Sequence, residues 1–370
     1  DWSSDVCSSD LGYRMRLDTR VGPRTQIEVV TEGVLTRMLQ SDPALEGVAA
    51  IVFDEFHERS LQADVGLALC LDARANLETT QRLIVMSATL DDVAVAGLLG
   101  TDTPIVRSEG RSFPVAIEYL GTGLPVLPGG PDAPERLVAA ATRRALRETD
   151  GDVLVFLPGA AEIRRVQEML ETAPEVVEDG VSLHRLYGEL DPREQELALA
   201  ASPHGPRRVI LATNIAETSV TLPGIRAVVD SGLVRRAVFD PVSGMSRLET
   251  QRISRASAEQ RAGRAGRVAA GRCYRLWSEG AQRSLAAFSR AEILDADLTP
   301  LALDLAEWGV GTEGSLRWLD APPAATIDGA RDLLRRLGAL DHLGRLTTHG
   351  RALASLPAHP RLAHLLIEAK

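Results

Sequence analysis

Residues 49–57 read A-A-I-V-F-D-E-F-H, a short apolar run that ends abruptly in two carboxylates. An unbroken apolar run of this length is typical of a strand in a parallel sheet with both faces buried. Acids that follow such a strand directly lie at its carboxyl end, where open α/β sheets bind their ligands. The stretch therefore predicts an α/β fold and makes Asp54 and Glu55 candidate site residues.

The same alternation of short apolar runs with longer amphipathic stretches extends along the chain and indicates β-α units around a mostly parallel sheet. Strands are predicted at residues 26–31, 48–53, 82–86, 152–157, 181–187, 207–212 and 225–230. Helices are predicted at 33–40, 61–76, 134–148, 160–171 and 193–200. A Gly/Pro cluster over 121–134 is predicted to link two α/β domains. Beyond about residue 278 only helical periods remain, as at 298–308 and 328–337, which predicts a separate, mainly helical tail.

Composition narrows the class of protein. With 370 residues, 45% hydrophobic and 25% charged, the chain is long enough for two packed domains and part of a third. The net charge of −10 means that a nucleic-acid partner needs a local basic patch, and residues 204–275 supply one, with 13 Arg against 5 acidic residues. No apolar run approaches the length of a membrane span and no leader pattern opens the chain, so the prediction is a cytoplasmic protein with no membrane partner.

Two residue counts exclude particular sites. The three cysteines, Cys7, Cys70 and Cys273, are widely spaced and support neither a disulfide framework nor a cysteine zinc site. The only lysine is Lys370, so the sequence contains no G-x-x-x-x-G-K-[ST] loop, whose Lys reaches the β and γ phosphates of a nucleotide. Residues 1–11 follow neither a helical nor a strand period and resemble translated sequencing-adapter DNA, so they are left out of the fold prediction.

The acidic pair after the first strand suits a magnesium site. A hard cation that bridges phosphates takes oxygen ligands, and a neighbouring carboxylate can act as general base toward water. The alternative, a polar strand end with solvated acids, stays open on these residues alone. Ser87-Ala88-Thr89 follows the strand at 82–86 and by itself indicates only a turn or a helix cap.

The most specific signal is Q-R-A-G-R-A-G-R at residues 260–267. A helix through it would place Gln260, Arg264 and Arg267 on one face, with Arg261 pointing elsewhere. Guanidinium groups suit phosphate oxygens, and the two glycines are unfavourable in a helix kept only for stability. The alternative is a solvated arginine face.

A second polar segment follows the strand at 207–212. It contains Thr213, Asn214, Glu217 and Thr218, whose small side chains and neighbouring backbone N–H groups can bind phosphates of a nucleic-acid backbone. A helix N-cap by Thr213 or Asn214 is equally compatible with the sequence.

Taken in order, D-E-F-H, S-A-T, A-T-N-I-A-E-T-S and Q-R-A-G-R-A-G-R resemble the motifs of the DEAH-box helicases of superfamily 2. T-E-G-V-L at 31–35 and F-L-P-G at 156–159 are similar to two further motifs of this family. The sequence around Phe56 resembles that of the bacterial HrpB-type helicases. The resemblance covers residues 12–370. It implies an ATP-dependent RNA helicase, a hydrolase acting on ATP.

The resemblance also implies an architecture. Two RecA-like parallel-sheet domains would be followed by a mainly helical winged-helix and ratchet segment. The expected boundaries are 1–11 for a non-native segment, 12–120 for the rest of the first domain, 121–134 for a linker, 135–285 for the second domain and 286–370 for the helical part. Residues 234–254, with Gly244-Met245, would form the family's strand-separating β-hairpin.

Residue roles follow from the same resemblance, with ATP and Mg²⁺ as cofactors and RNA or single-stranded DNA as partner. Asp54 and Glu55 would hold magnesium, and Glu55, within the D-E-F-H motif that ends in His57, would activate water. Gln260, Arg264, Arg267 and Thr218 would contact the nucleotide or the attacking water. Ser87 and Thr89 would couple nucleotide state to domain movement, while Thr31, Thr213 and Asn214 would touch the RNA backbone.

Two departures from the family pattern bear on activity. The phosphate-binding loop would precede Gly12, so the 370 residues alone are expected to bind ATP poorly and to have essentially no ATPase or unwinding activity. At the position where relatives carry a base-stacking aromatic, this chain has Ala198 and Leu199, which predicts loose nucleotide choice. Two other readings remain: a metal-dependent phosphohydrolase or nuclease built on Asp54, Glu55, His57 and Glu58, and a non-catalytic RNA-binding module.

Overall fold

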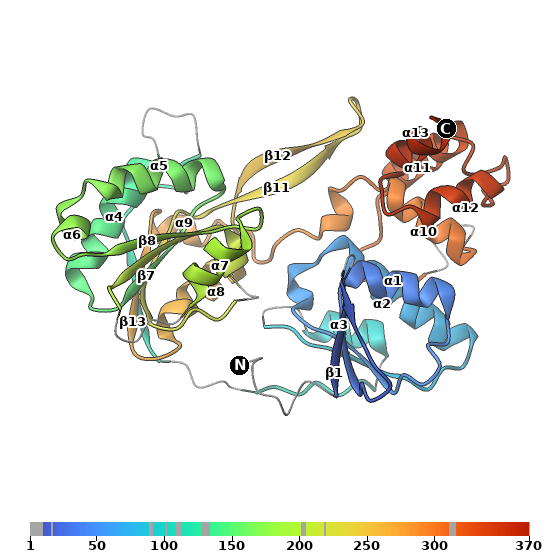
Figure 1. Ribbon diagram of the computed structural model, residues 1–370, viewed down its shortest axis with the longest axis horizontal. Coiled ribbons are helices and arrows are strands. Elements are labelled where there is room, and N and C mark those ends of the chain that lie inside the picture. The colour runs from blue at the N-terminus through green and yellow to red at the C-terminus, as the bar shows by residue number, and fades with distance from the viewer. Residues whose placement is uncertain are drawn as a thin grey trace. The chain divides into compact units, whose positions relative to one another are not determined.

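The computed structural model describes residues 10–15, 18–88, 92–100, 102–108, 113–127, 134–200, 205–217, 220–310 and 316–369. Contacts divide the chain into two compact units (Figure 1). Unit 1 contains Asp1–Ile105, Phe239–Ser246 and Arg290–Lys370, and unit 2 contains Val106–Val238 and Arg247–Ser289. Among the described residues, no helix combines the length and apolarity needed to cross a bilayer.

Unit 2 is built on a six-stranded parallel sheet with the strand order β6-β13-β10-β7-β9-β8. Four of these strands were predicted: β7 (Asp152–Phe156), β8 (Ser182–Leu186), β9 (Arg208–Ala212) and β10 (Ile225–Asp230). The other two, β6 (Val115–Tyr119) and β13 (Gly271–Arg275), were not. The α/β fold class with a parallel sheet is confirmed.

Helices cover both faces of this sheet. Alternate residues of β7 point to opposite faces: Val153 and Val155 pack with α4 (Pro134–Glu148), α5 (Ala160–Glu171) and α6 (Pro174–Val177), whereas Leu154 and Phe156 pack with α7 (Pro192–Leu199) and α8 (Arg255–Gly263). All four strand residues are completely buried. A strand buried on both faces has no polar alternation, which is why the apolar run predicted it.

A two-stranded sheet of β11 (Leu233–Asp240) and β12 (Met245–Arg252) leaves unit 2 and returns to it (Figure 1). It confirms the predicted hairpin. Gly244 at the turn has φ +65°, a left-handed conformation that favours glycine, and Arg361 donates to its carbonyl oxygen at 2.7 Å.

The first part of unit 1 contains two small sheets. In one, β1 (Leu11–Arg14) lies between β2 (Thr19–Arg20) and β3 (Ile27–Val30), and in the other β4 (Ala50–Phe53) pairs in parallel with β5 (Arg82–Val85). The helices are α1 (Glu32–Ser41), α2 (Leu61–Asn76) and α3 (Asp92–Leu99). The expectation that β4 is buried on both faces is wrong for the described residues, because Val52 is 50% exposed and only the face carrying Phe53 packs on the core.

The helical tail shares its core with the first part of unit 1. It contains α10 (Thr299–Trp308), α11 (Ala324–Arg336), α12 (Thr348–Ser355) and α13 (Pro360–Glu368), after two short helices, α9 (Glu279–Gln282) in unit 2 and the 3-10 turn η4 (Glu292–Leu294). Leu67 of α2 and Leu301 of α10 belong to one apolar cluster, and Trp308 donates its indole N–H to Asp72 at 2.8 Å.

The division by contacts therefore differs from the expected boundaries at two places. Unit 2 begins at Val106, upstream of the expected linker 121–134, because β6 pairs with β13 in the second sheet. Residues 286–370 were expected as a separate part, yet Arg290–Lys370 fall within unit 1, because apolar residues of the tail complete the core around α2.

Candidate active site

The segment after β4 is held in a tight, partly left-handed conformation. Phe56 begins the 3-10 turn η1 (Phe56–Glu58), is 1% exposed, and anchors the loop while its N–H donates to the carbonyl of Met86 at 3.1 Å. Glu55 has φ +49° and Arg59 has φ +53°, conformations that an L residue adopts only when its surroundings fix it. The loop is thus tied to the carboxyl end of the neighbouring strand β5.

The two predicted acids are exposed or half-buried at this edge. The Asp54 carboxylate accepts the Glu55 backbone N–H at 2.8 Å, and Glu55 Oε2 lies 3.4 Å from His57 Nε2. The Ala88 N–H donates to His57 Nδ1 at 3.4 Å, so the other ring nitrogen, Nε2, is the one that faces Glu55. His57 therefore connects the acidic pair to the Ser87-Ala88 turn.

Carboxylate oxygens at the rim of a sheet fit Mg²⁺, which usually takes one or two protein carboxylates and keeps its remaining positions for water and phosphate oxygens. Asp54 is exposed and the Glu55 side chain is 40% exposed, so both can reach a hydrated cation. These residues would hold the metal, if bound, by direct or water-mediated oxygen contacts. Ser87 is exposed beside them, while Thr89 lies outside the described residues.

A network of ion pairs around Arg59, which the sequence did not predict, holds the loop that follows the D-E-F-H motif. Arg59 is 7% exposed and donates to both oxygens of Asp64, at 3.2 and 3.1 Å, and to Asp320 at 2.8 Å. The Glu292 side chain accepts the Leu61 N–H at 2.8 Å, at the start of α2. Burial raises the pKa of Asp64 to about 6, although Arg59 opposes the shift. Residues of the helical tail thus hold Arg59 and Leu61, which lie shortly after the acidic motif.

In unit 2 the Q-R-A-G-R-A-G-R segment does not form one helix. α8 ends at Gly263, and Arg264–Gly266 continue as the 3-10 turn η3. The segment predicted as one helix is therefore an α-helix continued by a 3-10 turn, because glycine is a poor helix former, and the common face of Gln260, Arg264 and Arg267 stays a prediction. Gln260 is half-buried, Arg264 is 2% exposed, and Arg267 is exposed.

Arg261, which was expected to point away from the site, is the most deeply bound arginine of the motif. It is 1% exposed, donates to Glu217 Oε2 at 3.0 Å, to Asp230 Oδ1 at 2.9 Å and to the Leu233 carbonyl at 3.1 Å, and lies over the Phe156 ring. Arg264 donates to the Glu217 carbonyl at 3.0 Å and to the Val220 carbonyl. Unit 2 therefore joins the two predicted motifs through Glu217.

The polar segment after β9 is positioned as predicted at a strand end. Thr213 is the N-cap residue of the 3-10 turn η2 (Asn214–Ala216), but its side chain makes no capping hydrogen bond. Asn214 is exposed, and Thr218 lies outside the described residues. Thr31 resembles Thr213: it precedes α1 in an extended conformation, is exposed, and also makes no capping hydrogen bond with its side chain. The cap alternative does not account for either hydroxyl.

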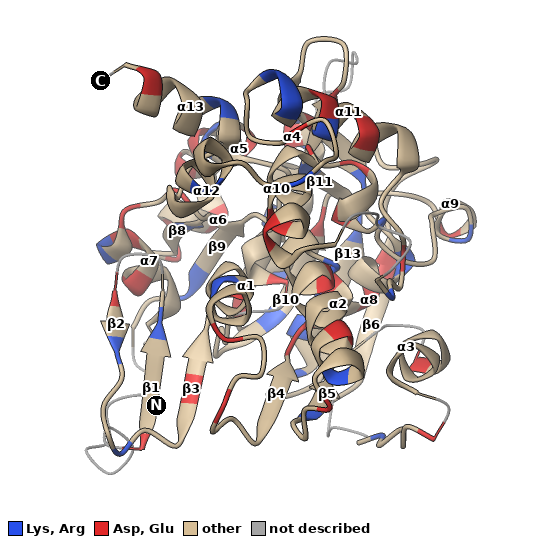
Figure 2. Cartoon of the chain, turned by 90° about the vertical axis from the view of Figure 1, so that its right-hand side faces the viewer, with Lys and Arg blue, Asp and Glu red and all other residues tan. Residues whose placement is uncertain are grey.

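The expected basic patch is smaller than the arginine count suggests. Of the arginines in residues 204–275, Arg208, Arg261, Arg264 and Arg275 are buried. Arg208 pairs with Asp152 and Arg275 with Glu259. In unit 1, arginines alternate with aspartates along α2 and α11 (Figure 2). The exposed arginines of the segment are Arg247, Arg252, Arg255, Arg267 and Arg272.

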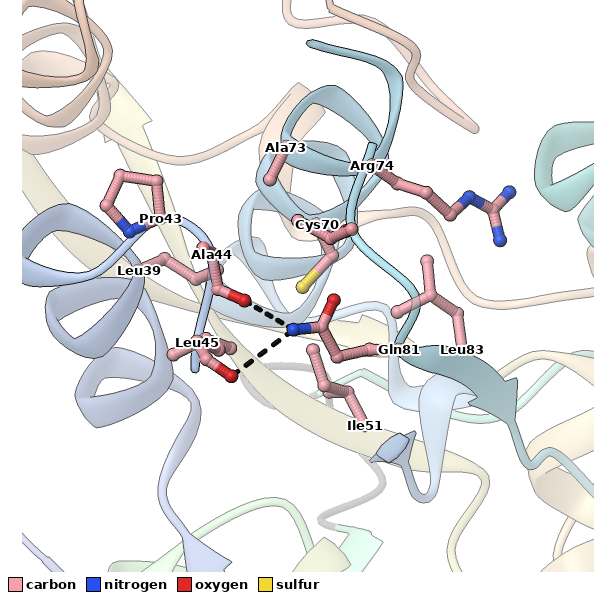
Figure 3. A pocket seen from close by; sticks show the side chains of 11 residues that line it. Leu39, Pro43, Ala44, Leu45, Ile51, Cys70, Ala73, Arg74, Gln81 and Leu83 are labelled. Carbon is pink, nitrogen blue, oxygen red and sulfur yellow. Dashed lines mark hydrogen bonds between the residues drawn. The ribbon is translucent and has the colours of Figure 1, made fainter. Parts of the chain in front are cut away.

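A cavity of about 10 Å³ lies between α1, α2 and the β4–β5 pair. Figure 3 shows the Gln81 amide directed at the carbonyls of Ala44 and Leu45, with the Cys70 thiol nearby. Such a volume holds about one water molecule and no nucleotide. Cys70 and Cys273 are free and buried, and burial raises the pKa of the Cys70 thiol to about 12, so both are structural rather than reactive.

Comparisons with known proteins agree with this arrangement. A family model described as "Helicase conserved C-terminal domain" matches residues 135–269. The chain is 48% identical over 360 residues to the ATP-dependent RNA helicase HrpB of Escherichia coli, covering 97% of this chain and 43% of that protein. It is 37% identical to the pre-mRNA-splicing factor ATP-dependent RNA helicase prp22 of Schizosaccharomyces pombe, over 96% of this chain and 30% of that protein.

Solved structures give the same picture. The crystal structure of the Escherichia coli DEAH/RHA helicase HrpB matches with a TM-score of 0.88 at 48% identity, covering 98% of this chain and 45% of that one. A second, titled the crystal structure of the E. coli DExH-box NTPase HrpB, matches with a TM-score of 0.85 at the same identity, over 98% of this chain and 44% of that one. The chain thus spans less than half the length of HrpB.

Proposed function

Because this chain belongs, over the length that it shares with them, to the DEAH-box helicases of the HrpB type, we propose that it is part of an enzyme that hydrolyses ATP to move along or unwind RNA. The observation that carries the proposal is the Asp54–Glu55 pair at the carboxyl end of β4, tied through His57 to the Ser87-Ala88 turn. A solvated strand end would need no such connection.

The proposed chemistry assigns a role to each acid. Asp54 would help to hold Mg²⁺, which would supply charge neutralisation at the phosphates when bound. Glu55 orients the attacking water and accepts its proton. His57, whose Nε2 lies 3.4 Å from Glu55 Oε2, positions the Glu55 carboxylate, and its Nδ1 contact with Ala88 lets the state of the acidic pair reach Ser87 and Thr89.

The arginines of unit 2 are proposed to contact the phosphates in unequal ways. Arg267 is exposed and can reach a nucleotide through its side chain alone, whereas Arg264 must first exchange its bonds to the Glu217 and Val220 carbonyls. Gln260 and Thr218 complete the proposed nucleotide contacts. Hydrolysis removes the γ-phosphate contacts, and the two domains then part.

RNA is proposed to bind by its backbone. Thr31, Thr213 and Asn214 are the proposed contacts, since Thr31 and Thr213 precede helical segments without a capping bond from their side chains and Asn214 is exposed beside Thr213. The β11–β12 hairpin is proposed to separate strands. Single-stranded DNA shares this backbone chemistry and is a second proposed ligand.

The test is RNA-stimulated ATP hydrolysis in a protein that extends residues 12–370 upstream with a G-x-x-x-x-G-K-[ST] loop. We expect magnesium-dependent turnover that Glu55→Gln lowers by about 10²- to 10⁴-fold. The 370-residue chain, which contains no such loop, is expected to turn over essentially no ATP. Turnover by this chain near that of the extended protein contradicts the proposed role of the loop, and nucleotide-independent cleavage of RNA supports the nuclease reading instead.

A further inference from the structure

Two histidines and a glutamate converge where α12 meets α13, outside every motif discussed so far. His349 Nε2 lies 2.9 Å from His364 Nδ1, and Glu368 Oε1 lies 4.0 Å from His349 Nδ1. One ligand-type atom from each of the three residues lies within 4.8 Å of the other two. The imidazole rings are nearly perpendicular, with 88° between their planes. Neither the acidic motif nor the arginine motif accounts for this convergence.

The packing of the helix pair brings the three residues together. Leu353 of α12 and Ala363 of α13 are buried in the unit 1 core, and Thr347 caps α12 by accepting the Gly350 N–H at 2.9 Å. His364 and Glu368 are four residues apart on α13, so they project from the same helix face. This i, i+4 spacing is the one by which a single helix presents two ligands to a metal.

The chemistry of the group favours a transition-metal cation. At 2.9 Å, one ring nitrogen donates an N–H to the lone pair of the other, and a cation in place of that proton would accept both lone pairs. In tetrahedral Zn²⁺ sites, with Zn–N bonds of about 2.0–2.1 Å, ligand nitrogens lie about 3.3 Å apart, so the rings need to separate by only a few tenths of an ångström. Glu368 is exposed, and its carboxylate can turn toward the same point.

We infer that His349, His364 and Glu368 form a Zn²⁺ site that clamps α12 to α13, with water in the fourth position. Nitrogen ligands suit zinc and not Mg²⁺, so this site is chemically distinct from the proposed magnesium site at Asp54 and Glu55. Zinc bound here stabilises the folded tail, because the ligands converge only when both helices are packed.

The test is a calorimetric zinc titration of the chelator-treated 370-residue chain. We expect one equivalent of Zn²⁺ whose affinity falls at least about 100-fold in His349→Gln and in Glu368→Gln, since even outer-shell partners of a metal change affinity 10- to 100-fold. The matched control is His342→Gln, an exposed histidine in the preceding turn, which should leave the isotherm unchanged. Zinc should raise the melting temperature of the parent chain and of His342→Gln only.

Isotherms of His349→Gln and Glu368→Gln that superimpose on that of the parent chain overturn the inference, as does an equal loss in His342→Gln. Zinc bound elsewhere, for example at Asp54–His57, appears as an equivalent that survives in both ligand variants. Circular dichroism checks the fold of each variant. If His349→Gln does not fold, Glu368→Gln decides alone, because its side chain is exposed in the last turn of α13.

Discussion

Replacing Arg261 by methionine is expected to destabilise unit 2 far more than the same change at Arg267, although the two arginines belong to one motif. Arg261 is 1% exposed and makes three hydrogen bonds, to Glu217, Asp230 and Leu233. Arg267 is exposed. The contrast separates what the motif does for the fold from what we propose it does for ATP.

The size of the expected stability loss follows from Asp230, the buried acid that loses its partner when Arg261 is replaced. Asp230 is completely buried, and without Arg261 its carboxylate keeps the Gly232 N–H at 2.8 Å as its hydrogen-bond donor among the contacts described. Breaking a buried ion pair by removing one partner costs about 3–5 kcal/mol, whereas a surface substitution changes stability by about 0.5 kcal/mol or less. Burial raises the pKa of Asp230, so the orphaned carboxyl can take up a proton and recover part of this loss.

The assay is hydrogen exchange of the β10 amides at increasing urea concentrations, which reports the global opening of unit 2. Arg261→Met should lower the free energy of opening by about 3–5 kcal/mol, and adding Asp230→Asn should restore part of it because the completely buried side chain at position 230 then carries no charge. A loss below about 1 kcal/mol in Arg261→Met, or an equal loss in Arg267→Met, refutes the reasoning.

Three further changes have defined outcomes. Burial raises the pKa of Asp304 to about 6, so the folded chain holds a proton there that the unfolded chain releases, and the contribution of Asp304 to stability should fall as the pH rises from about 4 to 6. Asp304→Asn, which can still accept from Gln40, should then be more stable than the parent in urea unfolding at pH 7.5, by up to ~3 kcal/mol, and similarly stable at pH 4; a difference between the two proteins that does not grow over this pH range contradicts the assignment. Arg59→Met should lower the stability of unit 1 by about 3–5 kcal/mol in urea unfolding. Asp320→Asn should lower it by about 1 kcal/mol or less, because the Asp320 side chain is 43% exposed. Similar losses in the two variants contradict the role given to the buried Arg59 ion pair. In the upstream-extended protein, Thr213→Val should weaken binding of single-stranded RNA to a similar degree whatever its sequence, as measured by fluorescence anisotropy, and an effect confined to one sequence contradicts a backbone contact.

The sequence predicted the parts of the fold whose residues share one environment. The Val/Leu run of β7 is buried on both faces, so composition alone reveals it. β13 was missed because its sequence, G-R-C-Y-R, ends in an arginine that looks solvent-exposed. Arg275 is in fact 1% exposed, bonded to Glu259 and Tyr119, and neither partner is near it in sequence.

The same limit applies to the candidate site. The sequence correctly predicted that Asp54, Glu55 and Thr213 lie at strand ends, because an apolar run followed by polar residues can be recognised from neighbouring residues alone. The roles of Arg261 and Arg59 depend on partners 31 and 261 residues away, Asp230 and Asp320, and the sequence contains no sign of these pairings. The prediction of one continuous helix through Gln260, Arg264 and Arg267 was wrong because α8 ends at Gly263.

We propose that the acids after β4 and the arginines after α8 act on one triphosphate. The most direct test is a double-mutant cycle on RNA-stimulated ATP hydrolysis in the upstream-extended protein, with Glu55→Gln, Arg267→Ala and the two combined. Each single change should lower kcat by roughly 10³-fold, and the double variant should be no slower than the slower single variant, because groups that act as a unit are strongly non-additive. A double variant in which the two losses multiply, or a Glu55→Gln variant with nearly full turnover, would contradict the account.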